Sequence, residues 1–361
     1  MKILIINTVP FDRNGITSVI MNFYRGLNEQ ISFDFIANSE ILEEYYSELS
    51  KKSIIFFIKK RKSNPFNYIF FVRKVLLENS YDLVHIHGNS SLMSLELFAI
   101  GKKIPIICHV HNVVSDYPLI NMILKKYFLK NYQCGISPTE EAGNFLFSGK
   151  PFHVIPNGID LKKFSFNMKK REVIRSTLAF NDDEKVIICV GNLNKQKFQD
   201  LIIKLMPELL REMKFQLMLL GDGERKSDLE ILAQTRGVGS YVHFLGSVEN
   251  IEDYYSAADI FVLPTHYESF GMVVAEAEAN GLPCLVSDTV PRGIMQIDDF
   301  LFLQNSDLSS WKNNIIMYSR SNKEKDLSYF DINRVKDNLL EIYKKAKDGI
   351  NHGIINNSSS I

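Results

Sequence analysis

The chain has 361 residues, of which 45% are apolar and 23% charged, a composition typical of a folded globular protein. Its 42 basic residues balance 42 acidic ones, so there is no overall positive charge to favour binding to nucleic acid. The four cysteines form no CxxC pair, which argues against a disulfide framework and against a structural zinc site. The length exceeds the usual size of one domain, about 150 residues, and predicts two domains.

The N-terminal apolar run is short. KILIIN is soon followed by Pro10, Asp12, Arg13 and Asn14, which leaves no room for the hydrophobic region of a signal peptide. No later segment reaches the roughly 18 consecutive apolar residues of a membrane-spanning helix. We therefore expect the protein in the cytoplasm, either free or at the inner face of the cell membrane.

The first half of the chain alternates short apolar segments with amphipathic ones. We predict strands at residues 2–7, 32–37, 54–57, 83–87, 106–109 and 134–136. We predict helices at 17–27, 66–79 and 92–100. Strands that are apolar on both faces and separated by helices are typical of a parallel sheet with right-handed crossovers.

The second half repeats this pattern after the turn sequence Pro156-Asn157-Gly158. Further strands are predicted at residues 186–191, 215–221, 241–246, 260–264 and 283–288. The predicted fold class is α/β, with two Rossmann-like, doubly wound domains and a cleft between them. We place the first domain at 1–168 and the second at 169–332. A helix at 333–348 that can pack back on the first domain follows, and then a flexible tail at 349–361.

The strongest functional motif is the segment 263–288, LPTHYESFGMVVAEAEANGLPCLVSD. Glu268 follows a predicted strand, Gly271 precedes a helix that begins near Met272, and Glu276 lies about one turn into that helix. The N-terminus of a helix suits a diphosphate, and a carboxylate can accept hydrogen bonds from a ribose diol. The alternative is that both glutamates are ordinary acids near a helix N-terminus, but this explains one glutamate better than the whole string.

This segment resembles the E-x7-E donor site of the retaining family 4 glycosyltransferases, which have the GT-B fold. The resemblance implies that Glu268 lies near the donor sugar and that Glu276 binds the ribose. It also implies that the intervening backbone binds the sugar and the diphosphate, through Ser269, Phe270, Gly271 and Met272.

The resemblance extends upstream to VGNLNKQK, residues 190–197. Lys197 occupies the place of a lysine that holds the donor phosphates. Asn192 stands where the family has an arginine, and this departure removes a cation that pairs strongly with phosphate. Two further segments are implied to reach the nucleotide and its base, through Gly221, Gly223, Gly246 and Val248.

In the first domain, Gly15 follows Asn14 at a place where many family members have a pair of glycines. The resemblance implies that its backbone approaches the diphosphate, whereas a plain turn before a helix is the simpler interpretation. The G-x-G-x-x-G pattern does not occur after the first strand, which argues against a nicotinamide-dependent dehydrogenase.

Two histidine pairs, HIH and HVH, place His85 with His87 and His109 with His111 on the same side of their strands. Clustered imidazoles can bind zinc or iron, but no carboxylate or cysteine accompanies these pairs at a matching spacing. We therefore predict no metal site and interpret most of these side chains as polar residues at strand ends. The resemblance implies that His111 lies beside the donor sugar, with His87 the second candidate.

The segment Lys51–Lys74 contains eight basic residues and no acid, and aromatic residues are interspersed among them. An ordinary strand, loop and helix would account for it. The functional hypothesis is a surface that meets an anionic membrane or a lipid-diphosphate acceptor.

The family resemblance implies sugar transfer from a nucleotide sugar with retention at the anomeric carbon, without a cofactor or a bound metal ion. The catalytic candidates are His111, Glu268 and Lys197. UDP is the expected nucleotide. The expected acceptor is a glycan or a lipid-linked glycan, because several segments resemble bacterial enzymes of capsular and exopolysaccharide synthesis.

Two alternatives remain open. The loss of the arginine at Asn192 and of one glycine at Asn14 would suit a weak or inactive relative that acts as a scaffold for a partner or a glycan. A nucleotide-sugar epimerase with the GT-B fold would use a similar nucleotide site.

Overall fold

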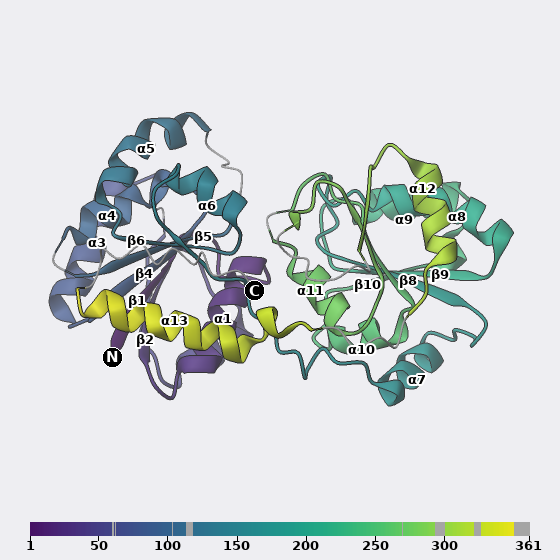
Figure 1. Ribbon diagram of the computed structural model, residues 1–361, viewed down its shortest axis with the longest axis horizontal. Coiled ribbons are helices and arrows are strands. Elements are labelled where there is room, and N and C mark those ends of the chain that lie inside the picture. The colour runs from purple at the N-terminus through teal and green to yellow at the C-terminus, as the bar shows by residue number, and fades with distance from the viewer. Residues whose placement is uncertain are drawn as a thin grey trace. The chain divides into compact units, whose positions relative to one another are not determined.

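The computed structural model describes residues 1–59, 61, 63–102, 104–112, 118–268, 270–292, 300–320 and 326–349. Contacts divide the chain into two compact units (Figure 1). Unit 1 comprises Met1–Gly158 together with the chain from Asp331 onward, and unit 2 comprises Ile159–Phe330. None of the helices in the described ranges has both the length and the apolar composition of a membrane span.

The boundaries between the units differ from those that the sequence predicts. The first lies after residue 158 rather than after 168, because Ile159 and Phe164 are buried in a hydrophobic core of unit 2. The second lies after residue 330 rather than after 332, since Phe330 also belongs to that core. The predicted tail falls almost entirely outside the described residues.

Unit 1 is built on a seven-stranded parallel sheet in the order β3-β2-β1-β4-β5-β6-β7. Its strands are β1 (Lys2–Asn7), β2 (Ser32–Ala37), β3 (Ile55–Phe57), β4 (Leu83–Gly88), β5 (Ile106–Val110), β6 (Cys134–Ser137) and β7 (His153–Val154). Its helices are α1 (Gly15–Leu27), α2 (Glu43–Leu49), α3 (Pro65–Glu78), α4 (Ser94–Ile100), α5 (Pro118–Asn131), α6 (Glu140–Phe147) and α13 (Ile332–Lys347). Helix α13 packs on α1 and β4, and its Tyr343 is buried there.

Unit 2 is built on a six-stranded parallel sheet in the order β10-β9-β8-β11-β12-β13. Its strands are β8 (Lys185–Val190), β9 (Phe215–Leu220), β10 (Val242–Gly246), β11 (Ile260–Leu263), β12 (Cys284–Ser287) and β13 (Phe300–Leu303). Its helices are α7 (Met168–Thr177), α8 (Asp200–Glu212), α9 (Lys226–Thr235), α10 (Ile251–Ala257), α11 (Met272–Ala279) and α12 (Leu308–Met317).

In both sheets the chain first adds strands on one side of its first strand and then returns to add the remaining strands on the other side. In unit 2 the chain proceeds from β8 outward to β9 and β10, and then returns to β11 on the other side of β8. In such sheets, ligands bind at the carboxyl ends of the two strands that flank the reversal. The loops that follow β8 and β11 therefore occupy the expected position of a ligand site.

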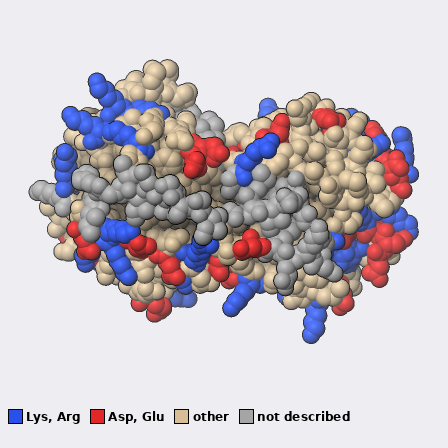
Figure 2. All heavy atoms as spheres, viewed as in Figure 1, with Lys and Arg blue, Asp and Glu red and all other residues tan. Residues whose placement is uncertain are grey.

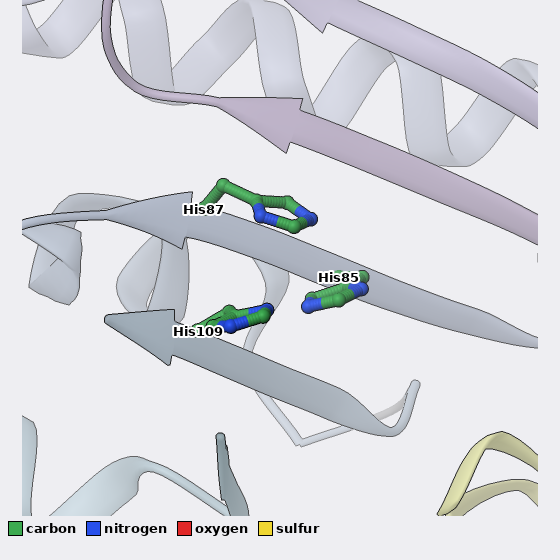
Figure 3. A group of neighbouring side chains, drawn as sticks. All are labelled: His85, His87 and His109. Atoms are coloured by element: carbon green, nitrogen blue, oxygen red, sulfur yellow. The ribbon is translucent and has the colours of Figure 1, made fainter. Parts of the chain in front are cut away.

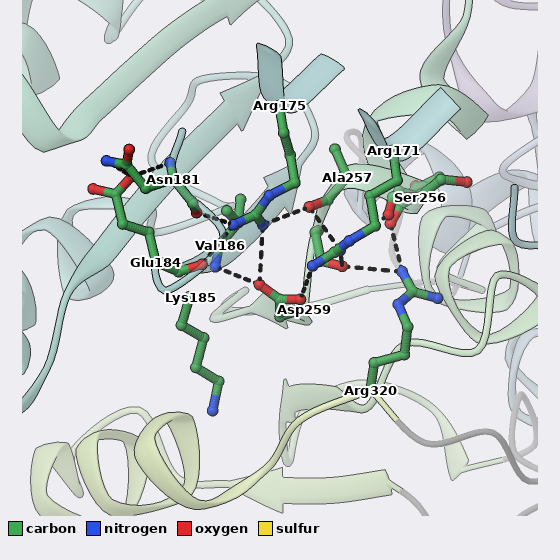
Figure 4. A network of polar contacts seen from close by, with 12 residues as sticks. Arg171, Arg175, Asn181, Glu184, Lys185, Val186, Ser256, Ala257, Asp259 and Arg320 are labelled. Carbon is green, nitrogen blue, oxygen red and sulfur yellow. Dashed lines mark hydrogen bonds and ion pairs between the residues drawn. The ribbon is translucent and has the colours of Figure 1, made fainter. Parts of the chain in front are cut away.

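At the amino ends of β8 and β11, opposite the expected ligand site, a network of charged side chains holds the unit 2 sheet (Figure 4). The carboxylate of Asp259, at the start of β11, accepts hydrogen bonds from Arg171 at 2.7 Å, Arg175 at 3.4 Å and the backbone N–H of Val186 at 2.8 Å. The two arginines lie on α7 and also donate to carbonyl oxygens at the end of α10. The network joins α7, β8 and β11 and so fixes the two strands beneath the candidate site.

Candidate active site

The loop after β8 carries Lys197. The side chain of Asn194 accepts a hydrogen bond from the backbone N–H of Lys197 at 3.0 Å, and this closes a tight local turn. Gly191, with φ of 144°, adopts a conformation that favours glycine, and a Cβ placed there would lie 3.2 Å from Cε of Lys197. The Lys197 side chain therefore passes close to the end of β8, and a Cβ at Gly191 would require it to shift by a few tenths of an ångström.

The loop after β11 is tied to the loop after β8. The N–H of His266 donates to the carbonyl oxygen of Gln196 at 2.7 Å, and the Gln196 side chain donates to the carbonyl oxygen of Tyr267 at 2.9 Å. The Thr265 hydroxyl lies within hydrogen-bond distance of the same two carbonyl oxygens. These contacts hold the segments around Lys197 and Glu268 side by side.

Lys197 and Glu268 form an ion pair through Nζ and Oε2. The two side chains are only 15% and 11% exposed, so solvent screens their attraction much less than that of a surface pair. Both residues are candidates from the sequence, but the sequence does not predict that they touch. The pair positions a cation and a carboxylate at the carboxyl edge of the sheet.

Helix α11 begins directly after this loop. Gly271 is its N-cap residue and has a left-handed backbone conformation, with φ of 79° and ψ of 55°. Residues with a Cβ adopt this conformation only at a cost in conformational energy. Gly271 cannot contribute a side-chain cap, so the first N–H groups of α11 can serve a ligand. The neighbouring Phe270 is buried in the core of unit 2 and anchors the loop. Ser269 lies outside the described residues.

Glu276 lies in the middle of α11 and is partly buried. The hydroxyl of the buried Tyr255 donates either to Oε2 of Glu276 at 3.1 Å or to the carbonyl oxygen of Val273 at 3.2 Å. Burial is the main cause that raises the pKa of Glu276 to about 7, although the Tyr255 hydrogen bond and Lys163 oppose it. Burial disfavours the ionised form of this carboxyl group, and a ligand that donates hydrogen bonds to the carboxylate is expected to stabilise that form.

The two glycines in the loop after β9 have clear packing reasons. A Cβ on Gly221 would lie 2.3 Å from the carbonyl oxygen of Gly191, and one on Gly223 would lie 2.3 Å from that of Leu193. Gly221 also donates its N–H to the carbonyl oxygen of Gly246 at 2.8 Å. These glycines let the strand-end loops pack closely. The nearby Val248 is partly buried against the core, and Asn192 is exposed.

Gly15 in unit 1 has no such packing reason. It is the first residue of α1, whose N-cap Asn14 accepts a hydrogen bond from the N–H of Thr17. A Cβ added to Gly15 would meet no atom within 4 Å, so the fold by itself does not require glycine here.

Four histidines of unit 1, His85, His87, His109 and His111, form one buried cluster at the ends of β4 and β5; Figure 3 shows three of them. Nδ1 of His87 lies 2.9 Å from Nε2 of His111, and Nδ1 of His85 lies 2.7 Å from the hydroxyl of Tyr343. Burial lowers the pKa of His85 and His111 to about 3, and that of His87 and His109 also falls. All four imidazoles are therefore neutral at neutral pH. They can donate or accept hydrogen bonds but cannot supply a positive charge.

The ring geometry of this cluster does not favour a metal ion. One ring nitrogen from each of His85, His87 and His109 lies within 4.8 Å of the others. However, the planes of His85 and His109 are inclined by only 2°, and each makes 34° with the plane of His87. Nitrogen lone pairs lie in the ring plane, so nearly parallel rings do not point at one ion about 2 Å from each nitrogen.

Two family models divide the chain much as the structure does. Residues 13–163 match the model described as Glycosyltransferase Family 4, and residues 170–300 match the one described as Glycosyl transferases group 1. The protein named glycosyltransferase EpsF of Bacillus subtilis (strain 168) is 30% identical over 296 residues, which are 77% of each chain. The chain belongs to glycosyltransferase family 4.

Further relatives agree with this assignment. An Escherichia coli protein named UDP-Gal:alpha-D-GlcNAc-diphosphoundecaprenol alpha-1,3-galactosyltransferase is 25% identical over 300 residues, or 75% of this chain and 77% of the relative. The crystal structure of Anabaena HepE in complex with UDP and glucose matches with a TM-score of 0.77 at 16% identity, over 96% of this chain and all of the other. The glycosyltransferase thus has the GT-B fold.

Within unit 2 of this glycosyltransferase, the fold gathers most of the residues that the sequence singled out. Lys197, Glu268, Gly271 and Glu276 follow the two strands at the reversal of the sheet, while Gly15 and His111 belong to unit 1. Sequence reasoning missed Tyr255. Its place in the helix IEDYYSA, just before the strand IFVL, fits a buried side chain but predicts no hydrogen bond to Glu276.

Proposed function

We propose that this glycosyltransferase moves a sugar from a UDP-sugar to a hydroxyl group of a glycan or a lipid-diphosphate-linked glycan, with retention at the anomeric carbon. The expected setting is the synthesis of a bacterial surface polysaccharide in the cytoplasm. The observation that carries the proposal is the Lys197–Glu268 pair at the reversal of the unit 2 sheet, followed directly by the N-terminus of α11, whose N-cap Gly271 has no side chain, and by Glu276.

Each of these groups suits one part of a nucleotide sugar. The Glu276 carboxylate would accept hydrogen bonds from the ribose diol. Lys197 and the N-terminus of α11 would hold the diphosphate, with the backbone from Ser269 to Met272. Glu268 would contact the donor sugar, and it holds Lys197 in place before the donor arrives. His111 would offer a neutral imidazole to the sugar, and Gly15 a close backbone approach to the diphosphate.

The chemistry follows from this placement. The bond between the anomeric carbon and the diphosphate oxygen breaks, and the charge that develops on the leaving group is stabilised by Lys197 and the helix N-terminus. The acceptor oxygen bonds to the anomeric carbon from the same face. Its proton passes to the departing phosphate, so no separate base is needed. We propose that this transfer requires neither a metal ion nor a cofactor.

The choice of UDP and of a lipid-linked acceptor is supported by relatives. HepE was solved with UDP and glucose, and the Escherichia coli relative is named for UDP-Gal and a diphosphoundecaprenol acceptor. Both statements concern those proteins, and for this chain they define the first compounds to test.

A scaffold function is the second candidate, because Asn192 is exposed at the end of β8 where the family has an arginine. An asparagine there supplies no charge to a diphosphate, so donor binding would depend on Lys197 and the backbone. A scaffold would bind a partner protein or a glycan but would not turn over a nucleotide sugar.

Donor binding can be tested by thermal shift with UDP-, GDP- and ADP-sugars in the presence of EDTA. A ligand that binds only the folded state raises its apparent stability by mass action. We expect a UDP-sugar to stabilise the wild type, the shift to be lost in Glu276→Ala, and Glu230→Gln on the exposed face of α9 to keep it. If no nucleotide sugar stabilises the wild type at millimolar concentration, the scaffold function becomes the better one. Once turnover is found, NMR of the product's anomeric proton tests retention.

A further inference from the structure

Helices α3, α4 and α5 each expose large apolar side chains on unit 1. They lie side by side, since α4 contacts both α3 and α5 (Figure 1). Their most exposed apolar side chains are between 52% and 87% exposed and are Phe66, Phe70, Leu77, Phe98, Leu119, Met122 and Ile123. We call this set the α3–α5 surface. Large side chains exposed together in this way usually mark an interaction site.

Helix α5 is anchored without these exposed side chains. On its inner side, Asn121 accepts hydrogen bonds from the backbone N–H and the hydroxyl of Ser91, and Phe128 is buried against Phe147. Leu119, Met122 and Ile123 point outward, so the fold does not explain why they are apolar. A sequence alone would assign them to the core.

The charges on the outward side of helix α5 are positive, while on α3 the exposed Glu78 pairs with Lys74 at 3.8 Å. Helix α5 has no acidic residue, and Lys126 and Lys130 are exposed on the same outward side as Ile123, one and two turns further along. Arg73 of α3 donates to carbonyl oxygens at the end of α4 and covers the ring of Phe98 at 5.3 Å. Figure 2 shows Lys and Arg atoms gathered over the part of unit 1 where Figure 1 draws these helices.

The basic segment Lys51–Lys74 contributes less free charge than its sequence suggests. Lys52 pairs with Glu29 and Lys59 with Glu40. Arg61 is buried and binds both carboxylate oxygens of Glu96 on α4, at 2.6 and 2.8 Å. Any contact of unit 1 with a membrane must therefore rely on residues other than these three paired cations.

We propose that the α3–α5 surface docks on an anionic phospholipid bilayer. Helix α5 would lie in the plane of the interface, with Leu119, Met122 and Ile123 among the acyl chains and Lys126 and Lys130 at the lipid phosphates. Outward-pointing apolar side chains followed by lysines, without acids, have the composition of an interfacial helix. A bilayer fits this charge better than a protein partner, whose surface would need a matching acidic patch.

Vesicle sedimentation tests the docking with no need for a donor or an acceptor. The probes are vesicles of phosphatidylcholine alone and of phosphatidylcholine mixed with phosphatidylglycerol. We expect binding to the mixed vesicles that weakens strongly when ionic strength rises from about 0.1 M to about 0.5 M. Lys126→Gln with Lys130→Gln should weaken binding about tenfold or more, and so should Leu119→Ser with Ile123→Ser.

The matched controls carry the same changes on other exposed helices. Ile231→Ser on α9 with Val173→Ser on α7 controls for the loss of apolar surface, and Lys169→Gln with Lys344→Gln controls for the loss of charge. These controls should bind the mixed vesicles like the wild type, while all variants keep the unfolding temperature and the shift with nucleotide sugar. Failure of that shift in every variant would concern the proposed function and not the docking.

Three results would overturn the proposal: no binding to the mixed vesicles, binding that the controls weaken as much as the test variants do, or equal binding to uncharged vesicles. Sedimentation of the free protein examines the remaining occupant, a second copy of the chain. If the wild type self-associates and Leu119→Ser with Ile123→Ser abolishes this, the surface is a contact between copies instead.

Discussion

Glu276→Gln tests the proposed nucleotide site through both stability and binding. The pKa of this carboxyl group is raised from an ordinary 4.5 to about 7, chiefly by burial. Between these values the unfolded chain loses the proton while the folded chain keeps it, so the carboxyl lowers stability progressively as pH rises from about 4.5 to about 7. The full shift corresponds to at most about 3 kcal/mol, and partial exposure to solvent reduces it to about 1–2 kcal/mol.

Glutamine has nearly the same shape and carries no charge, so it should remove this penalty. We expect the variant to match the wild type near pH 4.5 and to be about 1–2 kcal/mol more stable at pH 8. Urea unfolding measures the difference. The fluorescence of Trp311, the single tryptophan and a buried residue of α12, reports on unit 2. Glu230→Gln, exposed on α9, should leave stability almost unchanged at both pH values.

Donor binding should change in the opposite direction. An ionised carboxylate accepts hydrogen bonds from a ribose diol better than an amide does, and a charged hydrogen bond contributes about 1.5–3 kcal/mol. We expect Glu276→Gln to weaken binding of a UDP-sugar about tenfold or more at pH 8, and wild-type affinity to rise between about pH 6 and pH 8. A variant that gains no stability at pH 8 would refute the pKa argument. A variant that binds the donor like the wild type would refute the ribose assignment.

Four further substitutions separate packing from binding. Gly15→Ala should leave stability unchanged in urea unfolding, because the added Cβ meets no atom of the fold within 4 Å. The same Cβ should weaken UDP-sugar binding by blocking the approach of the diphosphate to the backbone, and unaltered affinity would remove Gly15 from the site. Gly221→Ala should lower the free energy of unfolding by about 2–4 kcal/mol, because its φ is 125° and its Cβ would strike the Gly191 carbonyl oxygen. Asp259→Ala should cost about 3 kcal/mol in the same assay, since it leaves two arginines without their carboxylate, and a near-neutral result would contradict the role given to the network. Asn192→Arg should tighten binding of a UDP-sugar about tenfold in a calorimetric titration, and an unchanged affinity would show that this position does not reach the diphosphate.

The sequence alone determined the class of fold and the motif around Glu268 and Glu276. Buried parallel strands are apolar on both faces, so runs such as KILIIN identify them without knowledge of any partner strand. The predicted strands match β1, β2 and β4 to β6 in unit 1, and β8 to β12 in unit 2, to within one or two residues at either end. A strand is also predicted from Phe152 up to the turn at Pro156, where β7 lies. The edge strand β13 was not predicted, because a run of four apolar residues without alternation does not distinguish a strand from a buried helix.

Only the tertiary structure decided which distant residues meet. Lys197 and Glu268 are 71 residues apart, and Arg61 and Glu96 are 35 apart, so no local spacing reveals either pair. The Lys197–Glu268 pair supports the candidate site, whereas the Arg61–Glu96 pair removes a free cation from the basic segment Lys51–Lys74. The apolar residues of α5 likewise turn outward, because Asn121 and Phe128 determine which side faces the sheet. Periodicity defines the faces of a helix, but the surrounding chain decides which face is covered.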